Sequence, residues 1–449
     1  MINQLVVVGA GLAGCEAAWQ AAERGIQVIL CEMRPFRQTE AHTTDQLAEL
    51  VCSNSLGSNQ ILSASGLLKE ELRRLGALLM SCADEAALPA GGALAVARER
   101  FSALVTEKIY AHPNIQVKRM EIENILDGPT IIASGPLTSD RLAQNISKLT
   151  GAKNLFFYDA LAPIVTVDSI DMGIAYRGSR YGGEAPDDGD YINCPMTREE
   201  YEVFVQALLS AERAPLHPFD QAVTDGVRAG ISGFFEQCLP IEVLAERGLQ
   251  SLAFGPMRPV GLRHGRPGRP PYAVLQLRQD NLAGTLYNLV GCQTNLTYSE
   301  QNRVFRLIPG LTHADFVRYG QMHRNTYILS PKLLQPTLQW RERANLFFAG
   351  QITGVEGYVG NIATGYLAGW NAARFINQQS LIIPPQTTMV GALCHYITHA
   401  PWETFQPMKA NLGLLPPATL PTRDKRLRKQ QMVDRSLSDI NRLIANSSN

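Results

Sequence analysis

The sequence predicts an α/β fold whose parallel sheet is interrupted along the chain by an inserted α+β domain. Apolar runs typical of strands buried on both faces of a parallel sheet occur at residues 5–8, 28–31, 131–135 and 346–350. From residue 156 to 312 the pattern changes to short β-like runs separated by Gly and Pro turns, with one helical stretch near 197–212. We therefore expect one domain made of two stretches of chain with a second domain between them. The expected boundaries are 1–155, 156–312 and 313–420, followed by a polar, basic tail at 421–449.

The N-terminal segment carries the clearest β-α-β pattern. Leu5–Val8 is a continuous apolar run, and a second run follows at Val28–Cys31. Between them, small residues recur at helical spacing and would give a helix one smooth face toward the sheet: Gly14, Ala17, Ala18, Ala21 and Ala22. Further helices are predicted at 67–83, 98–110 and Ala363–Ala373, whereas the Thr-, Ser-, Asn- and Gly-rich stretch 37–66 is predicted to form loops over a site.

The turn after the first strand matches the dinucleotide-binding pattern G-x-G-x-x-G. Its six residues are Gly9, Ala10, Gly11, Leu12, Ala13 and Gly14. Gly9 permits a tight turn, Gly11 lets the backbone approach a pyrophosphate at the helix N-terminus, and Gly14 allows helix and strand to pack closely. Glu32, at the end of the next strand, would accept hydrogen bonds from ribose hydroxyls and repel a 2′-phosphate. The alternative is a β-α-β unit whose turn binds nothing.

Two later glycine-ended strands favour FAD over NAD as the ligand of this turn. Thr130–Gly135 and Asn345–Gly357 resemble the strands that FAD proteins of the glutathione-reductase type place along the flavin, which makes Gly135 and Gly350 candidate cofactor contacts. Those proteins usually carry Gly-Asp where this chain has Gly350-Gln351, so the ribityl contact of that Asp cannot be transferred. The predicted fold is therefore a Rossmann-like FAD-binding domain of glutathione-reductase type, split by the inserted domain.

Several classes of function are excluded or left without support by composition. The 41 basic and 41 acidic side chains cancel, so a nucleic-acid site would have to be a local patch. The eight cysteines show no metal-ligand spacing, and we see neither a signal peptide nor a membrane span, so we expect a cytoplasmic protein without metal. The sequence contains no second G-x-G-x-x-G, so we do not expect a separate pyridine-nucleotide domain. Cys52 has no cysteine five residues later, where Gly57 stands, so it does not resemble a disulfide-reductase pair.

Longer motifs carry a resemblance to one family. They include EMRP (32–35), ELVCSNSLGSN (49–59), LPAGGALAV (88–96), FFEQCLPIEVLAERG (234–248), FGPMRPVGL (254–262), VRYGQMHRNTY (317–327), FAGQITGVEGYVG (348–360) and ETFQPMKANLGL (403–414). In this order, and together with VVVGAGLAGCEAAW (6–19), they resemble the methylenetetrahydrofolate- and FAD-dependent tRNA uracil-5-methyltransferases, the TrmFO family, over nearly the whole chain. Gln351 is the residue that this family carries. Departures from it are Ala97, Cys292 and the pair Gly360-Asn361, where Glu-Ser is typical.

The resemblance implies a specific reaction. The family uses FAD, takes its carbon from 5,10-methylenetetrahydrofolate and its electrons from NADH or NADPH, and converts a uridine in the T loop of tRNA into ribothymidine. A thiolate adding to C6 of uracil makes C5 nucleophilic, and a reduced flavin supplies the hydride. Alternatives are a flavin- and folate-dependent methyltransferase of 23S ribosomal RNA, a flavin oxidoreductase of a small molecule, or a flavin-containing RNA-binding protein without catalysis.

Candidate site residues follow from matched positions. Cys238 aligns with the family cysteine proposed to attack C6, and Cys52 with a second functional cysteine; the alternative for either is a small buried hydrophobe. His323 and Tyr358 match positions where the family packs rings against the pterin, and otherwise would be a structural histidine and a partly buried aromatic. Arg278 would pair with a folate carboxylate or form a surface salt bridge.

Contact with RNA requires local positive charge, which the sequence concentrates in two clusters. The first lies in a Pro- and Gly-rich loop: Arg258, Arg263, His264, Arg266 and Arg269. The second lies in the tail: Arg423, Lys425, Arg426, Arg428 and Lys429. Either would neutralise phosphates, and the alternative for each is a solvated face or a disordered tail. The sequence leaves open which cluster contacts RNA, the roles of the two cysteines, the oligomeric state and the choice between NADH and NADPH.

Overall fold

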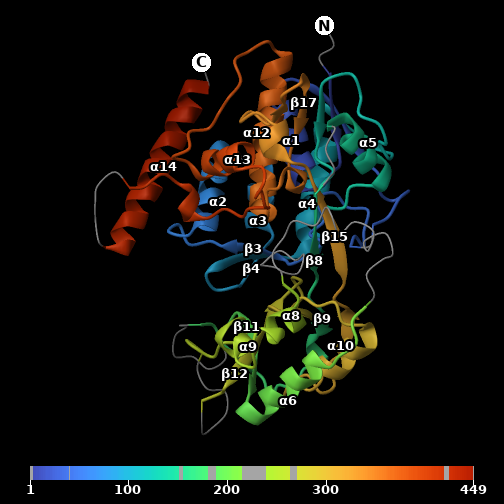
Figure 1. Cartoon of the computed structure of the whole chain (residues 1–449), viewed down its shortest axis with the longest axis vertical. Coiled ribbons are helices and arrows are strands. Elements are labelled where there is room, and N and C mark those ends of the chain that lie inside the picture. Colours follow the sequence, from blue (N-terminus) through green and yellow to red (C-terminus); the bar gives the residue numbers. More distant parts are fainter. Residues whose placement is uncertain are drawn as a thin grey trace.

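The molecule has two lobes, and the larger one holds both ends of the chain (Figure 1). The structure is a computed structural model that describes residues 4–39, 41–150, 155–180, 189–214, 239–262, 270–418 and 424–447. Each lobe is built around its own sheet and its own cluster of buried apolar side chains. Among these residues, no helix is long and apolar enough to cross a membrane.

The larger lobe is built on a six-stranded sheet with the order β16-β17-β7-β1-β2-β6. Five of its strands run parallel: β1 (Gln4–Val8), β2 (Gln27–Glu32), β6 (Ile115–Arg119), β7 (Thr130–Ile132) and β17 (Arg343–Phe348). The sixth, β16 (Gln339–Trp340), is antiparallel at one edge. The expected mixed α/β fold with a parallel sheet is thus confirmed. The sequence analysis did not identify β6, because this edge strand alternates between buried and exposed positions and lacks an apolar run.

Helix α1 (Leu12–Ala22) crosses α12 (Tyr358–Ile376) on one face of this sheet, with almost no side chain between the two backbones. A Cβ atom added to Gly365 would lie 2.3 Å from the carbonyl oxygen of Ala13, and one added to Gly369 would lie 2.3 Å from that of Ala17. Only glycine fits at such a distance. This close crossing brings the N-terminal ends of the two helices together near the glycine turn.

The stretch 67–83, predicted to be helical, is helical in the structure. Two helices occupy this stretch, α2 (Ala64–Leu75) and α3 (Leu78–Glu85). Gly76 ends the first helix in the left-handed conformation (φ 78°), which glycine adopts without the strain that a Cβ atom brings. The predicted helix at 98–110 corresponds to α4 (Arg98–Ala111). A small sheet beside them contains β3 (Ser55–Ser58), β4 (Ala87–Leu88) and β5 (Ala93–Val96).

The smaller lobe contains an antiparallel sheet with the order β10-β11-β12-β13-β9-β14. Its strands are β9 (Ile164–Thr166), β10 (Tyr176–Arg177), β11 (Tyr191–Met196), β12 (Ala273–Gln279), β13 (Leu286–Leu289) and β14 (Phe316–Arg318). Its helices are α6 (Arg198–Leu209), α8 (Ile241–Glu246), α9 (Ser251–Phe254) and α10 (Tyr298–Phe305). The antiparallel pair β8 (Leu155–Ala160) and β15 (Met322–Tyr327) runs between the two lobes (Figure 1).

The remaining helices cover the larger lobe. They are α5 (Asp140–Thr150), α11 (Ser330–Leu333), α13 (Met389–His399) and α14 (Lys425–Ser447). The sequence analysis predicted only a polar, basic tail where α14 stands. In the structure this helix packs against α2 and buries Met432, Val433, Ser436 and Ile440, so the interpretation as a disordered tail is wrong for residues 425–447.

A buried carboxylate joins α2 to both C-terminal helices. Glu71 accepts hydrogen bonds from the backbone N–H groups of Met389 at 2.7 Å and Val390 at 2.9 Å, in the first turn of α13. It also accepts one from the hydroxyl of Ser436 on α14. Burial raises the pKa of Glu71 from its ordinary value of 4.5 to about 7.

This raised pKa predicts a pH-dependent stability. The folded chain holds the Glu71 proton to higher pH than the unfolded chain. The stability that protonated Glu71 contributes is therefore fully present below about pH 4.5 and is lost as pH rises through about 7. Relative to the variant Glu71→Gln, the free energy of unfolding of the native chain should fall by about 1.4 kcal/mol per pH unit within that window. Urea unfolding of both proteins between pH 4.5 and 7.5 measures it. Parallel curves would contradict the prediction.

Candidate functional site

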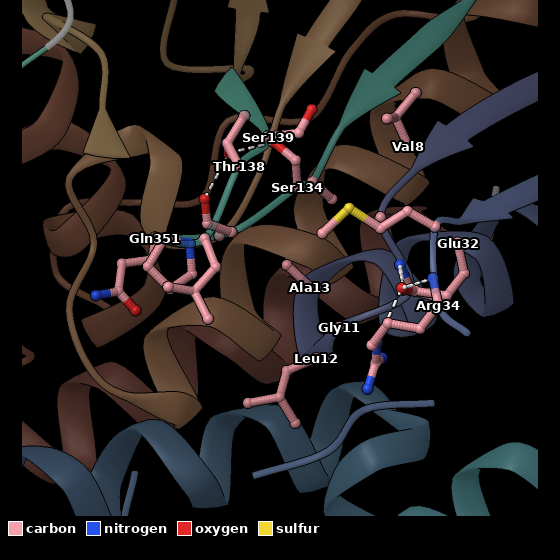
Figure 2. A pocket seen from close by; sticks show the side chains of 18 of the residues that line it. Val8, Gly11, Leu12, Ala13, Glu32, Arg34, Ser134, Thr138, Ser139 and Gln351 are labelled. Atoms are coloured by element: carbon pink, nitrogen blue, oxygen red, sulfur yellow. Dashed lines mark hydrogen bonds and ion pairs between the residues drawn. The ribbon is translucent and has the colours of Figure 1, made fainter. Parts of the chain in front are cut away.

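A cavity lies where the glycine turn, the end of β2 and the start of α12 meet (Figure 2). Nearly all the predicted nucleotide-binding residues line it: Gly9, Ala10, Gly11, Leu12, Ala13, Glu32, Gly135, Gly350, Gln351 and Tyr358. The structure therefore brings together residues that are far apart in the chain. Gly14 does not line the cavity, and packs behind the turn instead.

The three glycines of the turn differ in what surrounds them. Gly9 has a φ of +96°, and a Cβ atom there would lie 2.6 Å from the carbonyl oxygen of Ala133. A Cβ atom on Gly14 would lie 1.7 Å from the carbonyl oxygen of Gly9, which leaves no room for any side chain. A Cβ atom on Gly11 would meet nothing within 4 Å. Gly11 precedes α1, and no side chain caps that helix, so its first N–H groups are available to an anion in the cavity.

Glu32 lies at the far side of the turn and is held in its ionised form. One carboxylate oxygen accepts the N–H of Ala10 at 3.0 Å, and the other accepts the Nε–H of Arg34 at 2.9 Å. Burial alone would raise the pKa of Glu32, but the hydrogen bond and charge of Arg34 outweigh it and lower the pKa. Figure 2 shows the two side chains facing each other at the cavity wall. An ionised, fixed carboxylate here suits ribose hydroxyls, which donate to it.

Arg34 is a residue that the sequence analysis did not single out. It is 1% exposed, and it also donates to the carbonyl oxygen of Thr44 at 3.2 Å and pairs with Glu49 at 3.1 Å. It therefore connects the end of β2 to the loop that leads to Cys52. The signal in the sequence was an arginine two positions after the acidic end of a strand, inside the EMRP motif.

The opposite end of the cavity is formed by the start of α12 and the segment before it. Gly350 (φ +80°) packs against Ala13, from which its Cβ atom would be 2.8 Å. The side-chain amide of Gln351 donates to Glu356 at 2.7 Å, and in Figure 2 it lies across the cavity from Glu32. On the third side, the hydroxyls of Ser134 and Thr138 lie 2.7 Å apart beside Gly135. The cavity thus combines three features: the free N–H groups at the start of α1, which form an anion seat, the Glu32 carboxylate for ribose hydroxyls, and polar side chains at the opposite end. Together they fit a dinucleotide such as FAD.

A second cavity of about 450 Å³ adjoins the first. The two share Val51, Pro136, Gln351 and Tyr358 as lining residues. Cys52, which is half-buried, lines the second cavity together with Glu356, Asn325 and Lys409. The Tyr358 hydroxyl accepts the backbone N–H of Cys52 at 2.9 Å. A thiol therefore stands beside the far end of the nucleotide cavity, where a second ligand has room to bind.

Three arginines from distant elements hold the Cys52 loop, two of them through its backbone and one through its side chains. Arg98 donates to the carbonyl oxygens of Leu50 at 2.5 Å and Cys52 at 2.8 Å, and pairs with Asp280 at 2.9 Å. Arg318 donates to the carbonyl oxygen of Val51 at 2.9 Å. Burial would lower the pKa of Arg98, but the Asp280 carboxylate raises it, so the arginine stays charged beside the thiol.

Arg278 is the third of these arginines. It is buried, and donates to Asn54 at 2.7 Å and to Ser53 at 2.8 Å, so its interpretation as a surface salt bridge is wrong. It does not line either cavity described above, and its hydrogen-bond partners Asn54 and Ser53 belong to the loop. The sequence singled out Arg278 but neither Arg98 nor Arg318. The residues around these two arginines do not indicate that both contact the Cys52 loop.

A variant of Arg98 tests this support. Lysine keeps the charge but cannot donate at once to Leu50, Cys52 and Asp280, because it lacks the planar fork of arginine. For Arg98→Lys we expect the single-turnover rate of the reaction at this site to fall on the order of 10²-fold. The alkylation rate of Cys52, followed by mass spectrometry, should change as well. Arg100→Lys, at an exposed pair with Glu85, is the matched control and should change neither.

Two predicted residues cannot be placed at the site. Cys238 lies outside the described residues. His323 belongs to β15, where its backbone pairs with Asp159, but its side chain also lies outside what the structure describes. Asn325, two positions after His323, does line the second cavity: it is 1% exposed, and neither its Nδ2 nor its Oδ1 finds a hydrogen-bond partner among the described residues. Sequence reasoning had given Asn325 no role.

The basic clusters are placed only in part. Of the first, Arg258 is described, and the others at 263–269 lie outside the described residues. Of the second, Arg423 lies outside, and the rest begin α14 with exposed side chains: Lys425, Arg426, Arg428 and Lys429. Within the described ranges, no group of three or more His, Cys, Asp or Glu side chains is arranged to hold a metal ion.

Comparisons with known proteins agree on one family. The family model described as glucose inhibited division protein A matches residues 4–380. A methylenetetrahydrofolate–tRNA-(uracil-5-)-methyltransferase TrmFO of Halalkalibacterium halodurans is 54% identical over 439 residues, which cover 98% of this chain and 98% of the relative. The protein with the same name from Bacillus subtilis is 53% identical over 435 residues, 97% of each chain.

Solved structures show the same fold at much lower identity. A structure of Aquifex aeolicus GidA superimposes with a TM-score of 0.69 at 16% identity, covering 98% of this chain and 73% of that one. At such identity the likeness concerns the fold alone. The fold that this chain shares with GidA therefore extends over nearly its whole length.

Proposed function

This chain belongs to the family of the methylenetetrahydrofolate–tRNA-(uracil-5-)-methyltransferases called TrmFO, and we propose that the uridine it methylates lies in the T loop of tRNA. Folate-dependent methylation of tRNA uracil at carbon 5 follows from identity above 50% to relatives of that name along the whole chain. The single structural observation that supports methylation of a uracil at this site is the thiol of Cys52 in a cavity that adjoins the nucleotide cavity.

The nucleotide cavity is proposed to hold FAD. The N-terminus of α1 at Gly11 would receive the pyrophosphate, Glu32 the adenosine ribose, and the end near Gly350 and Tyr358 the flavin. Bound there, reduced FAD supplies the hydride that converts a methylene carbon into a methyl group. This arrangement supports a FAD domain of glutathione-reductase type formed by residues 1–155 and 313–420, with 156–312 inserted. The separate apolar cluster of the smaller lobe is consistent with that division.

The second cavity is proposed to receive the folate pterin and the target uracil. Uracil C5 attacks a one-carbon unit only after a nucleophile has added to C6, and a thiolate is suited to that step. We assign the addition to Cys238 and a proton transfer at C5 to Cys52, whose loop is fixed by Arg98 and Tyr358. Tyr358, together with His323, would contact the pterin. The charged guanidinium of Arg98 lies behind this loop.

The reductant and the RNA surface complete the proposal. NADH or NADPH would reduce the flavin without a dinucleotide-binding domain of its own, since the sequence contains only one G-x-G-x-x-G. The exposed basic side chains that begin α14 and the basic loop around Arg258 are the two candidate surfaces for tRNA phosphates. Neutralised phosphates make affinity fall with rising salt, so charge reversal at the responsible cluster should flatten that dependence.

One assay tests the function. The purified protein is incubated with undermodified tRNA, methylenetetrahydrofolate and NADH or NADPH, and the digested RNA is searched for ribothymidine by mass spectrometry. We expect product at the T-loop uridine only when folate is present. Equal product with S-adenosylmethionine in place of folate would overturn the proposal. Product in 23S ribosomal RNA but not in tRNA would replace it with the ribosomal alternative.

A further inference from the structure

Asn361 is a buried polar side chain that the proposed function has not used. It lies in the second turn of α12, is 8% exposed, and lines the nucleotide cavity. Its Oδ1 atom is fully buried and accepts no hydrogen bond from any described residue. A buried acceptor without a donor is costly, so its presence at a cavity wall indicates that a ligand supplies the donor.

The position of Asn361 limits which part of a dinucleotide it can reach. Asn361, Gly365 and Gly369 are spaced four residues apart and share the face of α12 that crosses α1. Gly365 and Gly369 close that crossing against Ala13 and Ala17, and Asn361 stands where the seam opens into the cavity. Its Oδ1 lies 3.7 Å from the position that a Cβ atom of Gly350 would take. Gly350 in turn packs against Ala13 in the first turn of α1, so the Oδ1 of Asn361 lies close to the anion seat at Gly11, on the side of Gly350.

Only one part of FAD supplies donors at this point. The pyrophosphate is acceptor-only and would repel an amide oxygen, and the adenosine ribose hydroxyls belong near Glu32 at the other end. The ribityl hydroxyls connect the pyrophosphate to the flavin, and each can donate. Gln351, which follows the third glycine motif, is tied to Glu356 through its amide N–H at 2.7 Å, whereas the Oδ1 of Asn361 is the buried acceptor that has no donor among the described residues.

We propose that Asn361 accepts a hydrogen bond from a ribityl hydroxyl of FAD, and so provides the contact that an Asp after the third glycine motif provides in proteins of the glutathione-reductase type. The inference rests on the proposed binding of FAD. It assigns the contact to a position where this chain departs from the Glu-Ser pair typical of the family. Asn361 is a cofactor-positioning residue, separate from the groups that touch the reacting carbon.

Affinity and stability measured on the same variants test this assignment. Asn361→Ala should weaken FAD binding to the apoprotein about tenfold, the effect of one hydrogen bond, measured by flavin fluorescence. The melting temperature of its apoprotein should not fall, because the deleted oxygen has no partner without cofactor. Asn371→Ala is the matched control on the same helix: its amide bonds Thr337 and Ile382, so the apoprotein should lose stability while FAD affinity stays unchanged.

A cofactor analogue separates a direct contact from an indirect one. In the analogue, an unsubstituted five-carbon chain replaces the ribityl chain. The native protein should bind this analogue more weakly than FAD. The ratio of the two affinities should be about tenfold smaller in Asn361→Ala, because the variant lacks the acceptor. Equal ratios in both proteins, or a loss of apoprotein stability like that of Asn371→Ala, would overturn the inference. If the native protein binds no FAD, the proposed function fails; if it binds FAD as tightly as the variant does, only this inference fails.

Discussion

Replacing Cys52 by alanine is expected to lower the single-turnover rate of tRNA methylation by about 10²–10⁴-fold, the range for loss of a proton-transfer group. The thiol lines the second cavity beside Tyr358, where substrate has room to bind. FAD content and the apparent affinity for tRNA should stay close to native values. The loss should therefore appear in the rate constant of the chemical step and not in binding.

The structure explains why this substitution isolates the thiol. Cys52 is held through its backbone: its N–H donates to Tyr358 at 2.9 Å, and its carbonyl oxygen accepts from Arg98 at 2.8 Å. Alanine keeps both groups, so the loop should remain in place. Cys82→Ala is the matched control, because this cysteine is buried in the core and burial raises its pKa to about 11. It should retain native activity with a small loss of stability.

The outcome also bears on how the two cysteines divide the reaction. If Cys52 transfers a proton after the carbon has been attached, Cys52→Ala should accumulate tRNA bound covalently through Cys238, detectable as a slowly migrating band on a denaturing gel. If Cys52 is itself the nucleophile, no such band should form. A variant with native rate would remove Cys52 from the mechanism altogether.

The parts of the fold that sequence predicted well depend on local patterns. The β-α-β unit around Gly9–Gly14 and the later strands ending near Gly135 and Gly350 are each encoded within a few neighbouring residues. The edge strand β6 was missed because half of its side chains face away from the core. Gly76 separates two helices within the stretch predicted to be helical, because it adopts a positive φ, which the sequence pattern alone does not reveal.

The candidate site was harder to predict where it depends on long-range contacts. Arg98, Arg278 and Arg318 converge on the Cys52 loop from three elements that lie far apart in the chain. Nothing in their local sequence distinguishes them from arginines that pair at the surface. Asn325 carried no signal in the sequence, and Asn361 stood out only as a departure from the family. That each has buried polar atoms without a partner among the described residues is known only from the structure. Motifs identified the site, and the structure identified its supporting residues.

The glycine turn provides the second large effect, as a contrast between two single substitutions. Gly11→Ala should leave the apoprotein folded, since its φ of −76° suits alanine and its Cβ atom would meet nothing within 4 Å. That Cβ atom would project where the backbone must approach the pyrophosphate. We expect FAD affinity to fall on the order of 10²-fold, by analogy with the loss of a close phosphate contact at a helix N-terminus, with an unchanged melting temperature of the apoprotein.

Gly14→Ala should instead damage the fold itself. Its Cβ atom would lie 1.7 Å from the carbonyl oxygen of Gly9, a backbone atom that cannot rotate away, so α1 must shift from the sheet. Because α1 also crosses α12 at Gly365 without a layer of side chains, the shift would disturb both helices. We expect a loss of more than about 4 kcal/mol in the free energy of unfolding, measured in urea without FAD. If both variants instead lost FAD with equally stable apoproteins, helix packing at Gly14 would not explain why glycine stands there.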